Sequence, residues 1–177
     1  MSSNRRIQSD LDPDTHLMSL LQVYQPRKIF LLSAIELPAV RDYQNASGSE
    51  VVTLNPAEKG FTAESLTSQP PVDLAIVVNV GATFPKKAAQ SVIGTIRNMV
   101  APKIAAYECL TTSVPENDWF ALGFKQLATF LSVANPTADK PLAFCQLAYG
   151  YDLGSYNHKR EWNNPKYWAN PEMWDKR

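Results

Sequence analysis

A chain of 177 residues has the size of one ordinary domain, and we expect a single unit with one core. Apolar residues make up 45% of the chain and charged residues 19%, a globular balance that excludes a largely disordered chain or a coiled coil. Seventeen basic and seventeen acidic side chains cancel, so no overall field attracts DNA, RNA or an anionic membrane, and nucleic acid is disfavoured as a partner.

The first residues argue against export. Arg5 and Arg6 are followed by the mixed segment 7–12, where a secretion signal needs an apolar stretch. No window of the sequence reaches the run of about 18 apolar residues that spans a membrane. We therefore expect a cytoplasmic protein without a membrane partner, and a flexible N-terminus over residues 1–11.

Residues 12–25 predict an amphipathic helix. Asp12 can cap the free backbone N–H groups, and Pro13 at the first helical position removes no donor that the helix needs. Leucines at helical spacing follow until Gln25 and Pro26 end the pattern.

Two strands are predicted next. Residues 28–34 form a nearly continuous apolar run, typical of a strand that is covered on both faces in a parallel sheet. A mixed segment runs through Tyr43, residues 45–49 predict a loop, and residues 50–54 predict a second strand that ends at Asn55.

The middle of the chain predicts a strand, a helix and a strand. After residues 57–71, where we expect one helical turn near 63–66, residues 72–80 give the strongest strand signal, and we place this strand at the centre of the sheet. An apolar stripe at helical spacing follows over 83–101, and a further strand is predicted over 103–110. This is a βαβ unit, with parallel strands and a right-handed crossover.

The last third predicts a short helix and a hairpin. Ser113 and Glu116 have the spacing of a capping box, and the helix that they start ends at Gly123. Strand signals over 124–133 and 141–151 flank a loop that is too short for a crossover helix. The predicted fold is therefore a three-layer, Rossmann-like α/β sandwich with a mostly parallel sheet and a C-terminal antiparallel hairpin.

Cysteine and histidine patterns give no catalytic or metal signature. Cys109 and Cys145 lie in apolar, strand-like runs, so we interpret both as buried free thiols. His16 and His158 have no carboxylate, cysteine or second histidine at ligand spacing, and no metal site is predicted. The Gly-x-Ser-x-Gly elbow of many hydrolases is absent from the sequence.

The order of these elements resembles the class I S-adenosylmethionine-dependent methyltransferases, whose last strand is inserted antiparallel. Residues 72–77 resemble the central strand of that family, residues 92–102 its following helix and turn, and residues 122–124 the entry into its penultimate strand. The resemblance covers about residues 17–151 and implies an S-adenosylmethionine site at the carboxyl ends of the strands.

The whole chain also resembles a small family of unknown function, mostly proteobacterial, that ends in Trp-Ala-Asn-Pro-Glu-x-Trp-Asp. Residues 168–175 match this ending. The resemblance implies no activity.

The positions at which the methyltransferase resemblance places the cofactor depart from that family's pattern. The loop from Ser33 to Pro38 has no glycine, although close approach to a nucleotide-type cofactor favours glycine there. Glu36 opposes a phosphate but is compatible with the ammonium group of S-adenosylmethionine. Asn55 stands where the family has an acidic residue for the ribose hydroxyls, and Asn79 is the one match to its Asn-Pro-Pro-aromatic stretch.

These polar residues still define a candidate crevice. Open α/β sheets bind ligands at the carboxyl ends of their strands, so we expect Ser33, Glu36, Asn55, Asn79 and Glu108 to surround one crevice. The alternative is structural, because polar residues at strand ends commonly satisfy loose backbone groups.

The segment 152–177 has an unusual aromatic pattern. Trp162, Trp168 and Trp174 recur every six residues, and Asn-Pro pairs precede the last two. We predict that this tail packs on the core (residues 12–151) as a clamp that covers apolar surface. Stacking on a base, a sugar or another ligand is the alternative.

Two functions follow from the sequence. The altered cofactor positions favour a non-catalytic or ligand-switched relative of the methyltransferases, which acts as a binding or assembly protein and needs no cofactor. The alternative is a divergent S-adenosylmethionine-dependent methyltransferase of unknown substrate. The expected partner is an unidentified small molecule or protein, and self-association is left open.

Overall fold

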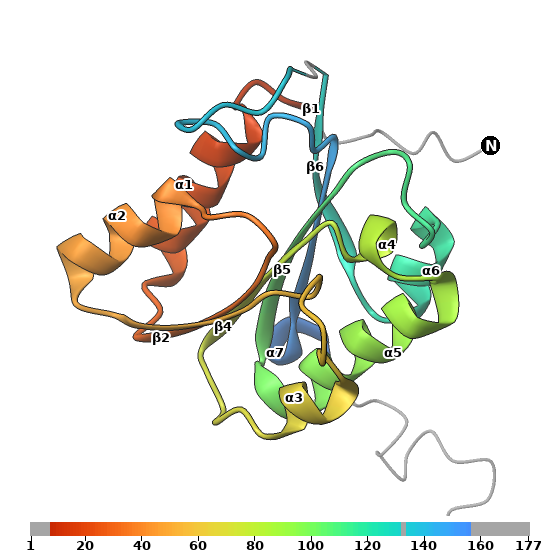
Figure 1. Cartoon of the computed structure of the whole chain (residues 1–177). Coiled ribbons are helices and arrows are strands. Elements are labelled where there is room, and N and C mark those ends of the chain that lie inside the picture. Colours follow the sequence, from red (N-terminus) through yellow and green to blue (C-terminus); the bar gives the residue numbers. More distant parts are fainter. Residues whose placement is uncertain (1–7, 132–133, 157–177) are drawn as a thin grey trace, which may run out of the picture.

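The computed structural model describes residues 8–131 and 134–156. Its centre is a seven-stranded sheet with the strand order β1-β6-β7-β5-β4-β2-β3 (Figure 1). The strands of this sheet are β1 (Gln8–Ser9), β2 (Lys28–Leu32), β3 (Glu50–Leu54), β4 (Leu74–Val78), β5 (Lys103–Glu108), β6 (Lys125–Phe130) and β7 (Leu147–Asp152).

Helices cover both faces of the sheet, which confirms the predicted three-layer α/β sandwich (Figure 1). One layer consists of α1 (Pro13–Tyr24) and α2 (Pro38–Ser47). The other layer consists of α3 (Ala63–Thr67), α4 (Val80–Thr83), α5 (Lys86–Thr95), a π-helical turn η1 (Ile96–Val100) and α6 (Glu116–Ala121). A short helix, α7 (Leu153–Tyr156), follows β7. In the described parts of the chain, no helix has the length and apolar character needed to cross a membrane.

The sheet is parallel from β3 through β5, and β7 is inserted antiparallel between β5 and β6. The predicted C-terminal hairpin is therefore confirmed, although its second strand begins six residues later than expected. Residues 141–146 form turns instead, because backbone groups there bond elsewhere: the Leu142 N–H donates to Asp14, and the Cys145 N–H donates to the Leu142 carbonyl oxygen. The two-residue strand β1, which pairs in parallel with β6, was not predicted.

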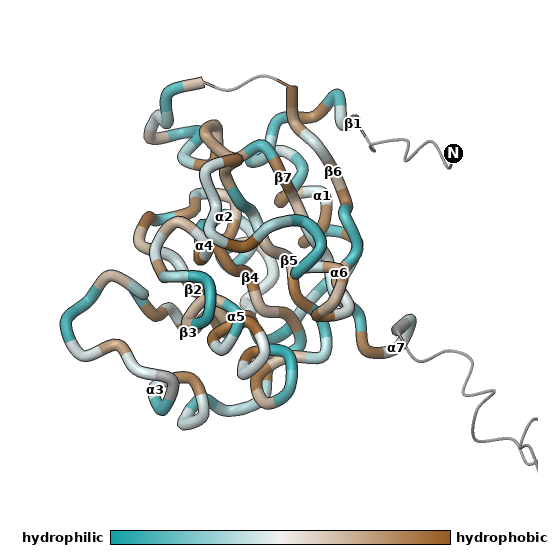
Figure 2. The backbone as a smooth tube through the Cα atoms, turned by 90° about the vertical axis from the view of Figure 1, so that its right-hand side faces the viewer, coloured by the Kyte–Doolittle hydropathy of each residue, from teal (hydrophilic) through white to brown (hydrophobic). Residues whose placement is uncertain are grey.

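Strand β4 lies in the interior of the sheet, between β2 and β5, and all five of its residues are buried. Ala75 and Val77 face the layer of α5, whereas Leu74, Ile76 and Val78 face the layer of α1. Figure 2 shows brown, apolar segments along the inner strands, although such segments also occur elsewhere in the tube. Burial on both faces explains the continuous apolar run.

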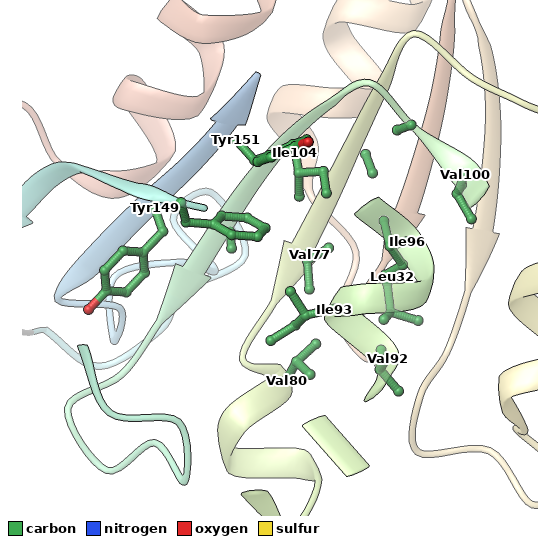
Figure 3. Packing of buried hydrophobic residues seen from close by; sticks show 14 of the residues in the cluster. Leu32, Val77, Val80, Val92, Ile93, Ile96, Val100, Ile104, Tyr149 and Tyr151 are labelled. Atoms are coloured by element: carbon green, nitrogen blue, oxygen red, sulfur yellow. The ribbon is translucent and has the colours of Figure 1, made fainter. Parts of the chain in front are cut away.

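The predicted helical stripe after β4 packs on the sheet as expected. Val92, Ile93 and Ile96 are buried against residues such as Val77 and Ile104 (Figure 3). The stripe continues through η1, which ends before the start of β5. A strand, a helical segment and a parallel neighbouring strand form the predicted βαβ unit.

Two local predictions were wrong. Residues 45–47 belong to α2, which ends at Gly48 in the left-handed conformation (φ 72°), so the loop expected over 45–49 starts later. This helix buries only Ala39 and Val40, which leaves too little apolar pattern to recognise. The capping box of Ser113 does not form, because its hydroxyl donates to the Phe84 carbonyl oxygen (2.8 Å) and α6 begins at Glu116.

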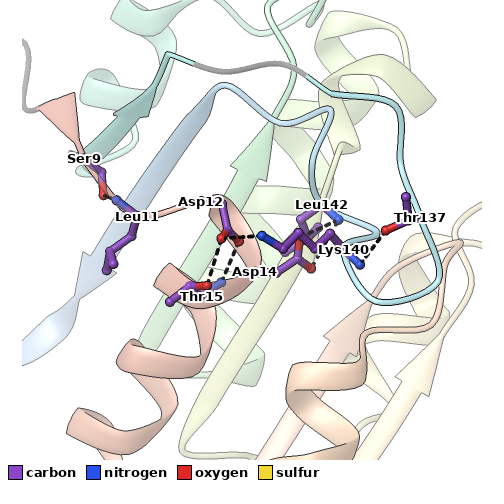
Figure 4. A network of polar contacts seen from close by, with 8 residues as sticks. All are labelled: Ser9, Leu11, Asp12, Asp14, Thr15, Thr137, Lys140 and Leu142. Carbon is purple, nitrogen blue, oxygen red and sulfur yellow. Dashed lines mark hydrogen bonds and ion pairs between the residues drawn. The ribbon is translucent and has the colours of Figure 1, made fainter.

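A polar network ties the connection between β6 and β7 to the first helix (Figure 4). Asp12 caps α1 as predicted, because its carboxylate accepts the Thr15 N–H (3.0 Å). The same carboxylate accepts Lys140 Nζ (3.0 Å), and Asp14 accepts the Leu142 N–H (3.1 Å). The segment before β7 is thereby held at the carboxyl edge of the sheet.

Candidate functional site

The topological switch point of the sheet lies between β2 and β4. From β2 the chain moves outward to β3 and then returns to β4 on the other side of β2. Ligands of open α/β sheets bind outside the carboxyl ends of the strands at such a point. Ser33, Asn55 and Asn79 follow β2, β3 and β4 directly, and Glu108 ends β5. The fold therefore brings these four predicted residues to one edge of the sheet.

Ser33 holds the loop that follows β2. Its hydroxyl donates to the Ile35 carbonyl oxygen (2.7 Å) and accepts the Ile35 N–H (3.1 Å), and the residue is only 3% exposed. Its backbone N–H donates to the Leu54 carbonyl oxygen (3.1 Å), which continues the pairing of β2 with β3. The side chain is thus engaged in shaping its own turn.

Glu36 and Asn55 also make local contacts. Glu36, in the loop before α2, pairs at 3.0 Å with Arg41 on that helix, and both side chains are more than half exposed. Asn55 Oδ1 accepts the Ala57 N–H (2.9 Å), the geometry of an Asx turn. Pro38 at the start of α2 lacks a backbone N–H, which leaves the first helical turn one donor short. The contacts of these positions match the structural alternative.

Asn79 joins the ends of β4 and β5. It adopts the left-handed conformation (φ 55°), and its backbone N–H donates to the Tyr107 carbonyl oxygen (2.7 Å). Its side-chain Oδ1 lies 3.0 Å from Cys109 Sγ and accepts the thiol proton. A left-handed non-glycine residue costs conformational energy and is more common for asparagine than for most residues.

Glu108 is the most deeply buried carboxylate at this edge, with 0% exposure. Both of its oxygens lie 3.2 Å from the Gly81 nitrogen and accept that N–H. Burial raises the pKa of Glu108 from 4.5 to about 7, although hydrogen bonds from Gly81, Thr112 and Val80 oppose the increase. The group therefore changes its charge near neutral pH.

The segment 109–115 covers the start of α4. The Ser113 N–H donates to the Gly81 carbonyl oxygen (2.7 Å). A Cβ atom built on Gly81 would overlap Thr112 Oγ1, so the Thr112 hydroxyl fills the space in front of this glycine. The protein's own side chains thus occupy the surface directly after β4.

The cysteines are both free, but only Cys145 is buried. Burial raises the pKa of the Cys145 thiol well above its ordinary value. Cys109 is partly exposed, which corrects the prediction, because β5 ends at Glu108 and the thiol lies in the following segment. His16 Nδ1 lies 2.9 Å from the Tyr107 hydroxyl and packs against Phe130.

Within residues 8–131 and 134–156, no cluster of three histidine, cysteine or acidic residues could hold a metal ion. His158 and the predicted aromatic tail with Trp162, Trp168 and Trp174 lie outside the described residues.

Sequence reasoning missed a cavity of about 540 Å³ at the same edge of the sheet, beyond Glu108. The ends of β6 and β7 and the segment 110–116 line it, and Gln126, Phe130, Gln146 and Tyr149 contribute side chains. The two glutamines interrupt apolar strand-like runs, a signal that could have drawn attention to this region.

The model of a family of unknown function, DUF6231, matches residues 11–177. No protein of curated function matches the sequence.

Solved structures with a similar fold include several methyltransferases. A methyltransferase from Geobacter sulfurreducens aligns over 82% of this chain and 80% of its own, with 14% identity and a TM-score of 0.50. An rRNA methylase from Escherichia coli aligns over 78% of this chain, with 12% identity and a TM-score of 0.45, and the chain spans only 62% of that protein. A Burkholderia thailandensis 1,6-didemethyltoxoflavin-N1-methyltransferase with bound S-adenosylhomocysteine aligns over 78% and 76% of the two chains, with 11% identity and a TM-score of 0.44. At these identities the likeness is one of fold.

Proposed function

Because the chain belongs to this family of unknown function and has a methyltransferase-like fold, we propose that it is a non-catalytic binding protein built on that fold. The observation that carries the proposal is the closed surface after β4. The segment 109–115 is bonded to the start of α4, and Thr112 fills the space in front of Gly81. A ligand placed against the start of α4, directly after β4, would have to displace this segment.

The positions after β2 and β3 support the same conclusion. The Ser33 hydroxyl both donates to and accepts from the backbone of Ile35, and Asn55 accepts the backbone N–H of Ala57. These local bonds already engage the Ser33 hydroxyl proton and the Asn55 side-chain oxygen, and no glycine is present to ease the approach of the backbone to S-adenosylmethionine. The residues therefore do not fit the cofactor, and we assign no methyl-transfer step to them.

A divergent S-adenosylmethionine-dependent methyltransferase is the second candidate, and Glu108 is the observation that favours it. A buried carboxylate whose pKa is raised to about 7 has the acid–base behaviour that enzymes often use at neutral pH. It lies near the switch point, and its neighbour Cys109 contacts Asn79. In the binding-protein proposal the same carboxylate has a structural role, because it accepts hydrogen bonds from Gly81, Thr112 and Val80.

Isothermal titration calorimetry of the full chain with S-adenosylmethionine and with S-adenosylhomocysteine tests the two functions against each other. The binding-protein proposal predicts no saturable heat with either compound at millimolar concentration. Micromolar binding of either compound would overturn it. If such binding is also weakened at least about tenfold in the Asn79→Ala variant but not in a Glu50→Gln variant, which alters an exposed carboxylate at the opposite end of β3, the ligand lies at the switch point.

A further inference from the structure

We propose that the cavity beside the carboxyl ends of β5 and β6 binds an uncharged aromatic small molecule. This inference deepens the proposed binding function and rests on it. With a volume of about 540 Å³, the cavity falls within the range of roughly 300–1,000 Å³ that is typical of small-molecule sites. It adjoins the closed surface after β4, and Thr112 belongs to both, since it fills the space in front of Gly81 and also lines the cavity.

The apolar wall of the cavity has a rigid aromatic backing. Tyr149 lines the cavity, and its ring stacks on Trp119 with 4.8 Å between the ring centroids and 9° between the ring planes. The Phe124 ring packs edge-on against the Trp119 ring, with 5.0 Å between the ring centroids. All three residues are at most 3% exposed, so the stack is part of the core. Tyr149 is seen among the buried residues in Figure 3. With so little accessible surface the stack serves as a rigid backing, and exposed lining residues such as Leu110 and Leu131 supply the apolar surface that a ligand can contact.

The two glutamines that line the cavity are neutral and oriented. Gln146 Oε1 accepts the Leu110 N–H (2.8 Å), which fixes the amide so that Nε2 remains as a donor. Gln126 Nε2 lies 2.7 Å from Thr129 Oγ1, so the second amide is also held in place. A ligand with one hydrogen-bond acceptor on its ring system would match the Gln146 donor.

The charge of the lining selects against anions. Among the described residues that line the cavity, Glu116 is the one charged side chain, and lysine and arginine are absent from the lining. A phosphate, sulfonate or carboxylate would lose its hydration there without gaining a cationic partner. This argument separates the expected ligand from nucleotides and from S-adenosylmethionine, which carries a carboxylate.

An exposed residue at the mouth of the cavity can be substituted to test the proposal. Leu131 lines the cavity and is 71% exposed, so its replacement should not disturb the core. Leu153 is 52% exposed and lies at the opposite edge of the sheet, because β7 runs from Leu147 beside Glu108 to Asp152 beside Lys103. Leu131→Arg and Leu153→Arg are therefore matched changes, one at the cavity and one away from it.

The experiment measures the fluorescence of two probes that share one ring system, the uncharged phenylnaphthylamine and its sulfonated analogue anilinonaphthalenesulfonate. We expect the uncharged probe to bind the wild-type chain at least about tenfold more tightly than the sulfonate. In the Leu131→Arg variant, the uncharged probe should bind about tenfold more weakly and the sulfonate more tightly. The Leu153→Arg variant should behave like the wild type, with all melting temperatures unchanged.

Other outcomes would overturn the inference. Equal affinity for both probes, or equal effects of the two arginine substitutions, would show that the probes bind elsewhere. Binding that appears only in a Trp168→Ala/Trp174→Ala variant would identify the tail of the chain as the occupant of the cavity. Binding of S-adenosylmethionine, by contrast, would overturn the proposed function while leaving a positive probe result in place, because the probes have neither a sulfonium nor a ribose.

Discussion

Glu108 keeps a carboxyl group in the core at a cost in stability. The residue has no exposed surface, and the Gly81 N–H shared between its oxygens at 3.2 Å only partly replaces the lost hydration. Its pKa of about 7 is the consequence. Below that pH the protonated carboxyl can itself donate a hydrogen bond, so the charge of this edge of the sheet depends on pH.

Replacement of Glu108 by glutamine should therefore flatten the dependence of stability on pH. The pKa of Glu108 is raised from 4.5 to about 7 in the folded state, so the folded chain binds more protons than the unfolded chain in this window. The free energy of unfolding consequently falls as the pH rises through the window. Chemical denaturation of the wild type from pH 5 to pH 8 should show this loss, and Glu108→Gln should remove most of it.

Asp14 provides an internal reference for that experiment. Burial raises the pKa of Asp14 to about 6. Its protonation therefore also makes the free energy of unfolding fall as the pH rises, but over a lower pH range than for Glu108. This contribution of Asp14 remains in the Glu108→Gln variant. A Glu50→Gln variant, in which a largely exposed carboxylate is replaced, should keep the wild-type slope. An unchanged slope in Glu108→Gln would mean that Glu108 is ionised throughout this range.

Gly81 and Gly94 should respond to alanine with opposite signs. At Gly81 the new Cβ would overlap Thr112 Oγ1 and crowd Glu108, so Gly81→Ala should cost about 1–3 kcal/mol. At Gly94, inside α5, nothing lies within 4 Å of the new atom, and Gly94→Ala should stabilise by roughly 0.5–1 kcal/mol. Urea denaturation of both variants checks the pair. Adding Thr112→Ala to Gly81→Ala should recover part of the loss, and no recovery would place the strain elsewhere.

The position of most site residues follows from the sequence, but their contacts do not. Ser33, Asn55 and Asn79 end apolar runs, so a strand-end rule places them at one edge of the sheet. The closure of Gly81 by Thr112 depends on residues 31 positions apart, whose approach is set by the pairing of β4 with β5. The hydrogen bond of Ser113 to Phe84, which displaced the predicted capping box, has the same origin.

At the scale of single elements, the N-terminus of α1 connects helix capping to the segment that precedes β7. Asp12 accepts the Thr15 N–H and also pairs with Lys140, in the segment that precedes β7. Asp12→Ala should destabilise the protein by about 0.5–2 kcal/mol through the lost cap. Lys140→Ala should cost less than about 1 kcal/mol, because the Lys140 side chain is more than half exposed. Thermal unfolding compares the two, and a larger loss in Lys140→Ala would show that the ion pair outweighs the cap.

Elements with a strong apolar period were predicted well, and weakly amphipathic ones were not. Strand β4 and the helical stripe of α5 bury nearly every apolar residue that defined their patterns. Helix α2 buries two residues and was predicted as a loop in part. The start of β7 moved because Asp14, far away in the sequence, binds the backbone of Leu142. Such long-range capture of a backbone group leaves no periodic signal in the sequence.

For the whole molecule, the carboxyl edge of the sheet divides into a closed part and an open part. Residues 109–115 close the surface at the start of α4, directly after β4, and the cavity opens next to it between this segment, β6 and β7. A fold can retain its layers while its ligand site moves along one edge, because the layers depend on the buried clusters and the site depends on the loops.

The aromatic tail is the remaining prediction for the whole molecule. Trp168 and Trp174 lie outside the described residues, and their spacing led us to predict that the tail covers apolar surface of the core. If it does, Trp168→Ala and Trp174→Ala should each lower the melting temperature by several degrees, since loss of a buried tryptophan costs about 3–5 kcal/mol when fully buried. Lys166→Ala, in the same segment, should have no measurable effect. Unchanged melting curves in both tryptophan variants would instead favour a tail that stacks on a ligand, and the probe titration with the same variants would then show whether that ligand competes for the cavity.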